Sequence, residues 1–213
     1  MKLFIDTANI EDIREMASYG IVKGVTTNPS LIAREGRKLE DVIQEIVKLV
    51  DGPISAEVNE APAEDMIKQA RELAKINKNI VVKIPMTWDG IKAVSTLSKE
   101  NIRTNVTLCF SVSQAQLAME AGASFVSPFL GRMDDAGFDS EKLINDIVTL
   151  RDTFGYETEI IAASIRNLHH VEVSALAGSD IATIPTAVMK KMINHPLTDK
   201  GLKIFAEAAK SIK

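Results

Sequence analysis

The amino-acid sequence predicts a closed (β/α)8 TIM barrel with one extra helix after the eighth unit. Short apolar runs and segments of helical periodicity alternate eight times along the chain, which is typical of parallel strands joined by helical crossovers. The length of 213 residues lies near the lower limit of about 200 residues for this fold. An open doubly wound sheet is the alternative, but no Gly-x-Gly-x-x-Gly motif follows the first apolar run.

The predicted strands are short apolar runs bounded by polar or turn-forming residues. The clearest is 80–85, where β-branched residues fill consecutive positions, as expected for a parallel strand buried on both faces. The eight runs occupy residues 3–6, 22–27, 54–58, 80–85, 104–109, 125–129, 159–164 and 181–185.

Between these runs, apolar residues recur three and four positions apart, which predicts amphipathic helices. Asn9 and Ser113 precede two of them as N-caps, and Pro29 fits a first helical turn. Gly122 and Gly178 stand where helices are expected to end. The clearest helical periods cover 42–50, 66–74 and 143–148, and a last amphipathic helix over 201–213 either caps the barrel or docks on a neighbouring subunit.

The composition predicts one globular domain that spans residues 1–213. Hydrophobic residues make up 46% of the chain, and the formal net charge is −4. This charge and the lack of a long basic tract argue against a nucleic-acid partner. The N-terminus enters an apolar strand at once and no apolar stretch approaches 18 residues, so we expect a cytoplasmic protein without membrane contact. A single cysteine allows neither an internal disulfide nor a cysteine metal cluster.

Lys83 lies inside the apolar run 80–85, two residues before its end. A charged ammonium is costly to bury, whereas a neutral amine is easier to bury and is a nucleophile. This position therefore predicts Schiff-base chemistry with a carbonyl substrate. A lysine that extends from the strand end into solvent is the alternative interpretation.

Polar side chains recur at the C-terminal ends of the predicted strands, where TIM barrels carry their active sites. Because side chains alternate along a strand, Thr26 and Asn28 share one face, as do Asn105 and Thr107. An amine, carboxylates, amides and hydroxyls in one barrel mouth are suited to covalent carbonyl chemistry, and they favour a catalytic lysine. The strand-end residues are Asp6, Thr26, Asn28, Glu57, Asn59, Lys83, Asn105, Thr107, Ser127 and Ser164.

Two arginines follow predicted strands: Arg132 after the sixth and Arg166 after the seventh. Guanidinium groups bind phosphate through two parallel hydrogen bonds, so both are candidates for a phosphorylated sugar. A solvated loop arginine is the alternative for each. The usual phosphate site of the barrel lies near strands seven and eight, which favours Arg166.

Several segments of the chain resemble transaldolase motifs. The Thr-Thr-Asn-Pro-Ser-Leu segment at 26–31 is highly specific, and the matches follow in order along essentially the whole chain. The chain is therefore similar to the short branch of the transaldolase family, which also contains the fructose-6-phosphate aldolases. The matching segments are Asp6-Thr7, 24–32, 82–85, 105–108, 127–132 and 163–167.

This resemblance implies a metal-free class I mechanism without a cofactor. Lys83 would form a Schiff base with the donor ketose, Asp6 would accept the C4 hydroxyl proton, and Glu57 with Thr107 would hold the water for proton transfer. The dihydroxyacetone unit would pass from sedoheptulose 7-phosphate or fructose 6-phosphate to glyceraldehyde 3-phosphate or erythrose 4-phosphate, in the non-oxidative pentose phosphate pathway. The implied substrate-binding residues are Thr26, Asn28, Asn105, Ser127 and Phe129 for the donor, and Arg132, Ser164 and Arg166 for its phosphate.

Two positions favour a transaldolase over an aldolase. Fructose-6-phosphate aldolases tend to carry glutamine where this chain has Glu57 and tyrosine where it has Phe129. An aldolase that releases dihydroxyacetone is the second hypothesis. The third is a non-catalytic barrel that binds sugar phosphates, which is disfavoured because binding alone has no use for a lysine buried at a strand end.

The resemblance also implies a homo-oligomer, since short members of the family are often decamers of two stacked pentamers. Two pairs of neighbouring polar residues are interpreted as structural. His169 and His170 are adjacent on a predicted helix and point in different directions, so they do not form a metal pair. Asp134 and Asp135 lack further carboxylates at calcium-loop spacing and are expected to lie in a solvated loop.

Overall fold

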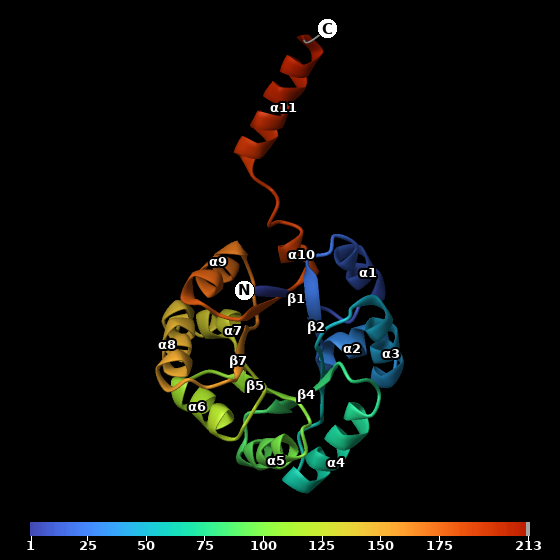
Figure 1. The fold of residues 1–213 in the computed structure, drawn as a ribbon, viewed down its shortest axis with the longest axis vertical. Helices are drawn as coiled ribbons and strands as arrows, with labels where there is room; N and C mark the ends of the chain where they lie inside the picture. Colours follow the sequence, from blue (N-terminus) through green and yellow to red (C-terminus); the bar gives the residue numbers. More distant parts are fainter. Residues whose placement is uncertain (212–213) are drawn as a thin grey trace.

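The computed structural model describes residues 1–211 and contains a closed barrel of eight parallel strands, as predicted (Figure 1). The strands follow one another around the barrel in sequence order, and β1 pairs with β8 to close it. Every strand lies within two residues of its predicted bounds. They are β1 (Lys2–Asp6), β2 (Val22–Thr26), β3 (Ile54–Glu57), β4 (Ile80–Pro85), β5 (Thr104–Cys109), β6 (Phe125–Pro128), β7 (Glu159–Ala162) and β8 (Ile181–Ile184).

Helices surround the barrel and bury their apolar faces against the strands (Figure 1). Three short helices are additional to the alternation of one strand and one helix: α2 follows β2, α7 follows β6 and α10 follows β8. No helix within residues 1–211 is long and apolar enough to cross a bilayer. The helices are α1 (Ile10–Ser18), α2 (Pro29–Glu35), α3 (Leu39–Leu49), α4 (Ala63–Ala74), α5 (Trp88–Lys99), α6 (Val112–Glu120), α7 (Leu130–Asp135), α8 (Ser140–Phe154), α9 (Leu168–Ala177), α10 (Thr186–Met189) and α11 (Pro196–Ser211).

Most of the predicted helix boundaries are confirmed. The Asn9 side chain caps α1, and Pro29 opens α2. Gly178 ends α9 in a left-handed conformation with φ of 91°. The N-cap predicted at Ser113 is wrong, because Ser111 has the extended backbone of an N-cap and its side chain accepts the N–H of Gln114, the third residue of α6.

The interior of the barrel has an apolar floor beneath a polar layer. The floor consists of Phe4, Val81, Phe125, Ile161 and Ile181, all buried. Gly24 is needed beside it, because a Cβ at this position would lie 2.5 Å from the Phe4 ring. Side chains two positions apart on a strand share a face. The next inward side chain on most of these strands, two residues after the apolar one, is polar. These polar side chains include Asp6, Lys83, Ser127 and Thr183.

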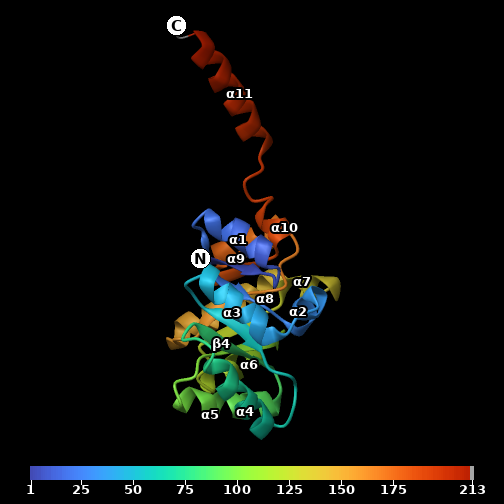
Figure 2. The same ribbon diagram turned by 90° about the vertical axis from the view of Figure 1, so that its right-hand side faces the viewer.

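The C-terminal helix α11 stands away from the barrel in both views (Figures 1 and 2). It begins at Pro196, five residues before the predicted start at Gly201, and the last two residues of the prediction, 212–213, lie outside the described chain. No residue of α11 is buried, so it does not cap its own barrel. Its exposed apolar side chains are Leu197, Leu202, Ile204 and Phe205.

Candidate active site

A cavity of about 320 Å3 opens at the C-terminal ends of the strands. It brings together side chains from five strands and from the loops that follow them. Of the twelve predicted site residues, nine line this cavity; the remaining three, Glu57, Asn105 and Thr107, lie on the neighbouring strands β3 and β5. The nine are Asp6, Thr26, Asn28, Lys83, Ser127, Phe129, Arg132, Ser164 and Arg166.

Lys83 is buried at the base of this cavity, with 6% of its surface exposed. Its Nζ lies 2.9 Å from Oε2 of Glu57 and donates a hydrogen bond to the carbonyl of Thr27 at 3.3 Å. Lys83 and Glu57 are register partners on β4 and β3, so the ion pair follows directly from strand pairing. The alternative of a lysine that extends into solvent is wrong.

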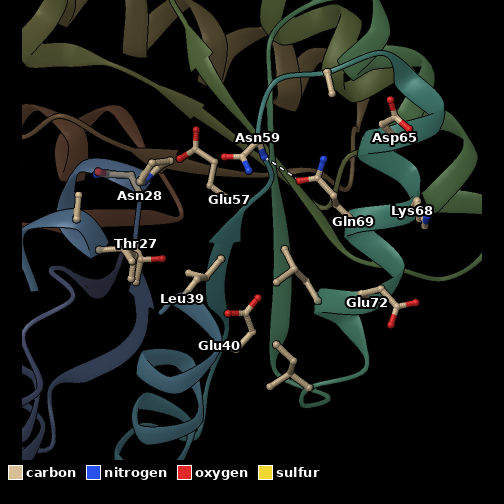
Figure 3. Close-up of a pocket in the computed structure, with 16 residues that line it drawn as sticks. Thr27, Asn28, Leu39, Glu40, Glu57, Asn59, Asp65, Lys68, Gln69 and Glu72 are labelled. Atoms are coloured by element: carbon tan, nitrogen blue, oxygen red, sulfur yellow. Dashed lines mark hydrogen bonds between the residues drawn. The ribbon is translucent and has the colours of Figure 1, made fainter. Parts of the chain in front are cut away.

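Glu57 does not line this cavity but lines a larger one of about 980 Å3, which Figure 3 shows. The larger cavity lies beside the barrel, between α2 and α3 on one side and α4 on the other. Asn59, which the sequence placed among the strand-end residues, lines it and donates its backbone N–H to Gln69. Three acidic residues also line it, while Lys83 does not, so the amine faces the smaller cavity. These acidic residues are Glu40, Asp65 and Glu72.

A chain of hydroxyls supports Asp6. Thr26 donates to Oδ1 of Asp6 at 2.9 Å, and the hydroxyl of Thr183 lies 2.5 Å from that of Thr26. Because each hydroxyl has one proton, Thr183 donates to Thr26 while Thr26 donates to Asp6. Burial raises the pKa of Asp6 above its ordinary value, although Lys83 and the Thr26 hydrogen bond act in the opposite direction.

A second polar network lies on β5 and β6. The amide oxygen of Asn105 accepts from Ser127 at 2.7 Å, and its nitrogen donates to Ser55 at 3.2 Å. These side chains are buried, so the network fixes Ser127 at the edge of the cavity. The buried Thr107 hydroxyl has no hydrogen-bond partner among the residues that the structure describes. The same is true of the hydroxyls of Thr104 and Thr186, and Thr107 lines neither of the two cavities.

Arginines from two helices and one loop also line the cavity. The Arg132 guanidinium lies 5.1 Å above the centre of the Phe129 ring, within range of a cation–π contact. Phe129 is itself held edge-on by Phe110 at 5.7 Å. Arg166 pairs with Asp135 at 3.0 Å. Arg34 of α2 also lines the cavity, so three arginines line the same space as Lys83.

Two residues that follow strands, Asn28 and Ser164, are constrained by the local backbone. Asn28 caps α2 by accepting from the Leu31 N–H at 3.0 Å, which leaves its amide N–H groups available. Ser164 has a positive φ of 57°, an uncommon conformation for a residue other than glycine. Backbone strain of this kind is concentrated at functional sites.

Of the two residue pairs interpreted as structural, the aspartates need correction and the histidines do not. Asp134 and Asp135 do not lie in a solvated loop: they end α7, where Asp134 contacts His170 and Asp135 contacts Arg166. The different orientations of the two histidines are confirmed, since His170 is buried and His169 is exposed.

The sequence interpretation also missed residues that the structure brings to the site. Thr183 falls in the predicted run 181–185 at the same inward position as the other strand-end residues, so strand alternation could have identified it. Arg34 carried no such signal, because its approach to the cavity depends on the orientation of α2. Ser55 and the carbonyl of Thr27 were also overlooked; both contact predicted site residues.

We expect Asp6→Asn to stabilise the protein at neutral pH. The raised pKa of Asp6 means that the folded state holds this proton more tightly than the unfolded state. The folded protein therefore loses stability as the pH rises from the pKa of Asp6 in the unfolded state to its pKa in the folded state. The asparagine of the variant does not ionise, so it avoids this loss. Each kcal/mol regained raises Tm by about 2–4 °C in a chain of this size.

Thermal unfolding of wild type and Asp6→Asn at several pH values measures this effect, and the difference should shrink toward acid pH. The exposed Asp41→Asn serves as a control that should not raise Tm. A Tm for Asp6→Asn at or below that of wild type at neutral pH would contradict a net cost of the buried carboxylate.

Comparison with known proteins places the whole chain in one family. Residues 3–213 match the family described as Transaldolase/Fructose-6-phosphate aldolase. A "Probable transaldolase" of Lactiplantibacillus plantarum is 58% identical over 213 residues, which cover 100% of this chain and 98% of that protein. Proteins with the same name from Clostridium acetobutylicum (60% over 205 residues, 96% and 95% covered) and Geobacter sulfurreducens (56% over 212 residues, 100% and 99% covered) are similarly close. The chain belongs to the transaldolase/fructose-6-phosphate aldolase family.

Proposed function

We propose that this protein is a transaldolase that moves a dihydroxyacetone unit from a ketose phosphate to an aldose phosphate through a Schiff base on Lys83. The observation that carries the proposal is a buried amine, 2.9 Å from a carboxylate, at the base of a cavity lined by arginines. Sedoheptulose 7-phosphate and fructose 6-phosphate are the proposed donors. Glyceraldehyde 3-phosphate and erythrose 4-phosphate are the proposed acceptors, as in the non-oxidative pentose phosphate pathway.

Glu57 has the position of a proton acceptor for Lys83. Transfer of the ammonium proton to Glu57 leaves a neutral amine, which attacks the ketone carbon of the donor. The resulting carbinolamine loses water to give the imine, and this step needs a group that delivers a proton to the departing oxygen. The unpaired hydroxyl of Thr107 supports the idea that a water bound between Thr107 and Glu57 carries that proton.

Asp6 has the position of the base for carbon–carbon cleavage. Its carboxylate faces the same cavity as Lys83 and interacts electrostatically with it. Removal of the C4 hydroxyl proton breaks the C3–C4 bond, the electron pair moves into the imine as an enamine, and the aldose leaves. A pKa raised by burial makes Asp6 a stronger base than an exposed aspartate.

The remaining residues of the cavity suit a sugar phosphate. Asn28 and Ser127 offer polar groups to the hydroxyls of the bound donor, while Asn105 holds Ser127 and Thr26 holds Asp6. Arg132, Ser164 and Arg166 form the proposed phosphate site, since guanidinium groups match the geometry of phosphate oxygens.

Incubation with fructose 6-phosphate and borohydride is expected to fix a three-carbon adduct on Lys83, because borohydride reduces an imine to a stable amine. Mass spectrometry of the peptide that contains Lys83 detects this adduct. Lys83→Met should lose turnover by at least about 1000-fold, the scale expected when covalent catalysis is removed. Loss of activity with the adduct on another lysine would overturn the assignment.

The fate of the bound three-carbon unit separates a transferase from an aldolase. Phe129 offers neither a proton nor an anchor for water at the enamine, whereas a tyrosine would supply a hydroxyl. Phe129→Tyr is therefore expected to raise dihydroxyacetone release relative to transfer several-fold, the effect of one hydrogen bond of about 1 kcal/mol. Glu57→Gln should increase this release further.

The measurement is the yield of free dihydroxyacetone and of transfer product from fructose 6-phosphate, with and without erythrose 4-phosphate. A wild-type protein that releases dihydroxyacetone as fast as it transfers it would favour the aldolase hypothesis. Absence of both products, together with intact binding of sugar phosphate, would favour a non-catalytic barrel.

We also propose that the protein is a homo-oligomer in which α11 contacts a neighbouring copy. The support is the exposed apolar face of this helix, which includes Leu202 and Phe205. Patches of this kind mark interaction surfaces. Sedimentation velocity should give a mass several times that of one chain, and Leu202→Glu with Phe205→Glu should lower it. A monomeric wild type would contradict this part of the proposal.

A further inference from the structure

His170 is buried on the first turn of α9, behind the loop that carries Arg166. Its Nδ1 accepts a hydrogen bond from the backbone N–H of Arg166 at 3.1 Å. Its Nε2 lies 2.7 Å from Oδ2 of Asp134 on α7. A ring nitrogen that accepts an N–H carries no proton, so the proton is on Nε2 and is donated to Asp134. The imidazole therefore joins two elements that meet at the cavity.

The carboxylate that receives this hydrogen bond is itself held in place. Partial burial raises the pKa of Asp134, but hydrogen bonds from Ser140 and His170 outweigh this effect and leave the pKa below its ordinary value. Asp134 is therefore an ionised acceptor, and charged acceptors form the stronger hydrogen bonds. The next residue, Asp135, pairs with the guanidinium of Arg166. As a result, α7 holds the side chain of Arg166 directly through Asp135, and its backbone indirectly through Asp134 and His170.

The loop between β7 and α9 needs such support. Ser164 has a positive φ of 57°, a strained conformation for a residue other than glycine, which persists only where the surroundings hold it. Gly131 packs against this loop and donates its N–H to the Ser164 carbonyl at 2.9 Å, and any Cβ at Gly131 would lie 2.2 Å from that oxygen. The amide of Arg166 has His170 as its partner.

We propose that His170 is a positioning residue for phosphate recognition: it fixes the backbone of Arg166, and with it the reach of the guanidinium into the cavity. This inference rests on the proposed function, in which Arg166 binds the substrate phosphate. A histidine that only stabilises the packing of α7 and α9 would affect all substrates alike. A positioning residue affects phosphorylated substrates and spares those without phosphate.

The test compares two substitutions of His170, each of which preserves the hydrogen bond made by one of the two ring nitrogens. Asparagine places an oxygen near the position of Nδ1, so His170→Asn can still accept from Arg166. Glutamine places its amide near Nε2, so His170→Gln reaches Asp134 but leaves the Arg166 N–H unpaired. His169→Gln is the matched control, because His169 is adjacent and exposed.

Steady-state kinetics are measured with two substrate pairs: fructose 6-phosphate with erythrose 4-phosphate, and dihydroxyacetone with unphosphorylated glyceraldehyde. For the phosphorylated pair, His170→Gln should lower kcat/KM roughly tenfold, chiefly through KM, because a buried donor is left without its acceptor. The unphosphorylated pair should stay within about twofold. His170→Asn should recover most of the loss, and His169→Gln should behave as wild type.

Arg166→Ala separates failure of this inference from failure of the phosphate assignment. If Arg166→Ala loses activity selectively with phosphorylated substrates while His170→Gln does not, only the role of His170 is overturned. If Arg166→Ala shows no selectivity, the phosphate site and this inference fail together. If His170→Gln does not fold, Asp134→Ala interrupts the same chain from its other end, and the same selective loss is expected.

Discussion

The buried ion pair between Lys83 and Glu57 is the interaction on which the arrangement of the site depends. Two charges removed from water stabilise each other only if the geometry is good and further hydrogen bonds are available. Strand register supplies that geometry, since the two residues are partners across β4 and β3. The carbonyl of Thr27, directly after β2, supplies a further acceptor. Loss of either partner would leave an uncompensated charge in the barrel.

This constraint explains why the inner surface of the barrel changes from apolar to polar over a single step of strand alternation. The lower layer, which includes Phe4 and Val81, supplies hydrophobic stabilisation and excludes water from below. The layer above it is polar but almost completely paired, through Thr26, Asn105 and Ser127. A paired network is rigid, so it can present a few free groups to the cavity without collapsing around them.

The strands and the burial of Lys83 could be predicted because both depend on local sequence pattern. The strands follow from apolar runs and alternation, and Lys83 stands out as a charged residue inside an apolar run. Other features depend on tertiary contacts that no spacing reveals. The pairing of Asp134 with His170 joins α7 to α9, and Arg34 enters the cavity only because α2 turns it there. The N-cap of α6 was assigned to the wrong serine, since Ser111 and Ser113 differ only in backbone conformation.

The exposure of α11 has a consequence for how the chain folds. A helix of sixteen residues, none of which is buried, is only marginally stable in water, because helix nucleation is costly and a short helix has few hydrogen bonds to offset that cost. In the proposed oligomer, the order of this segment is therefore linked to the neighbouring copy that it contacts, and its folding and its binding become a single equilibrium. Helical content should then depend on protein concentration, so the helical circular dichroism signal would report the association of the chains.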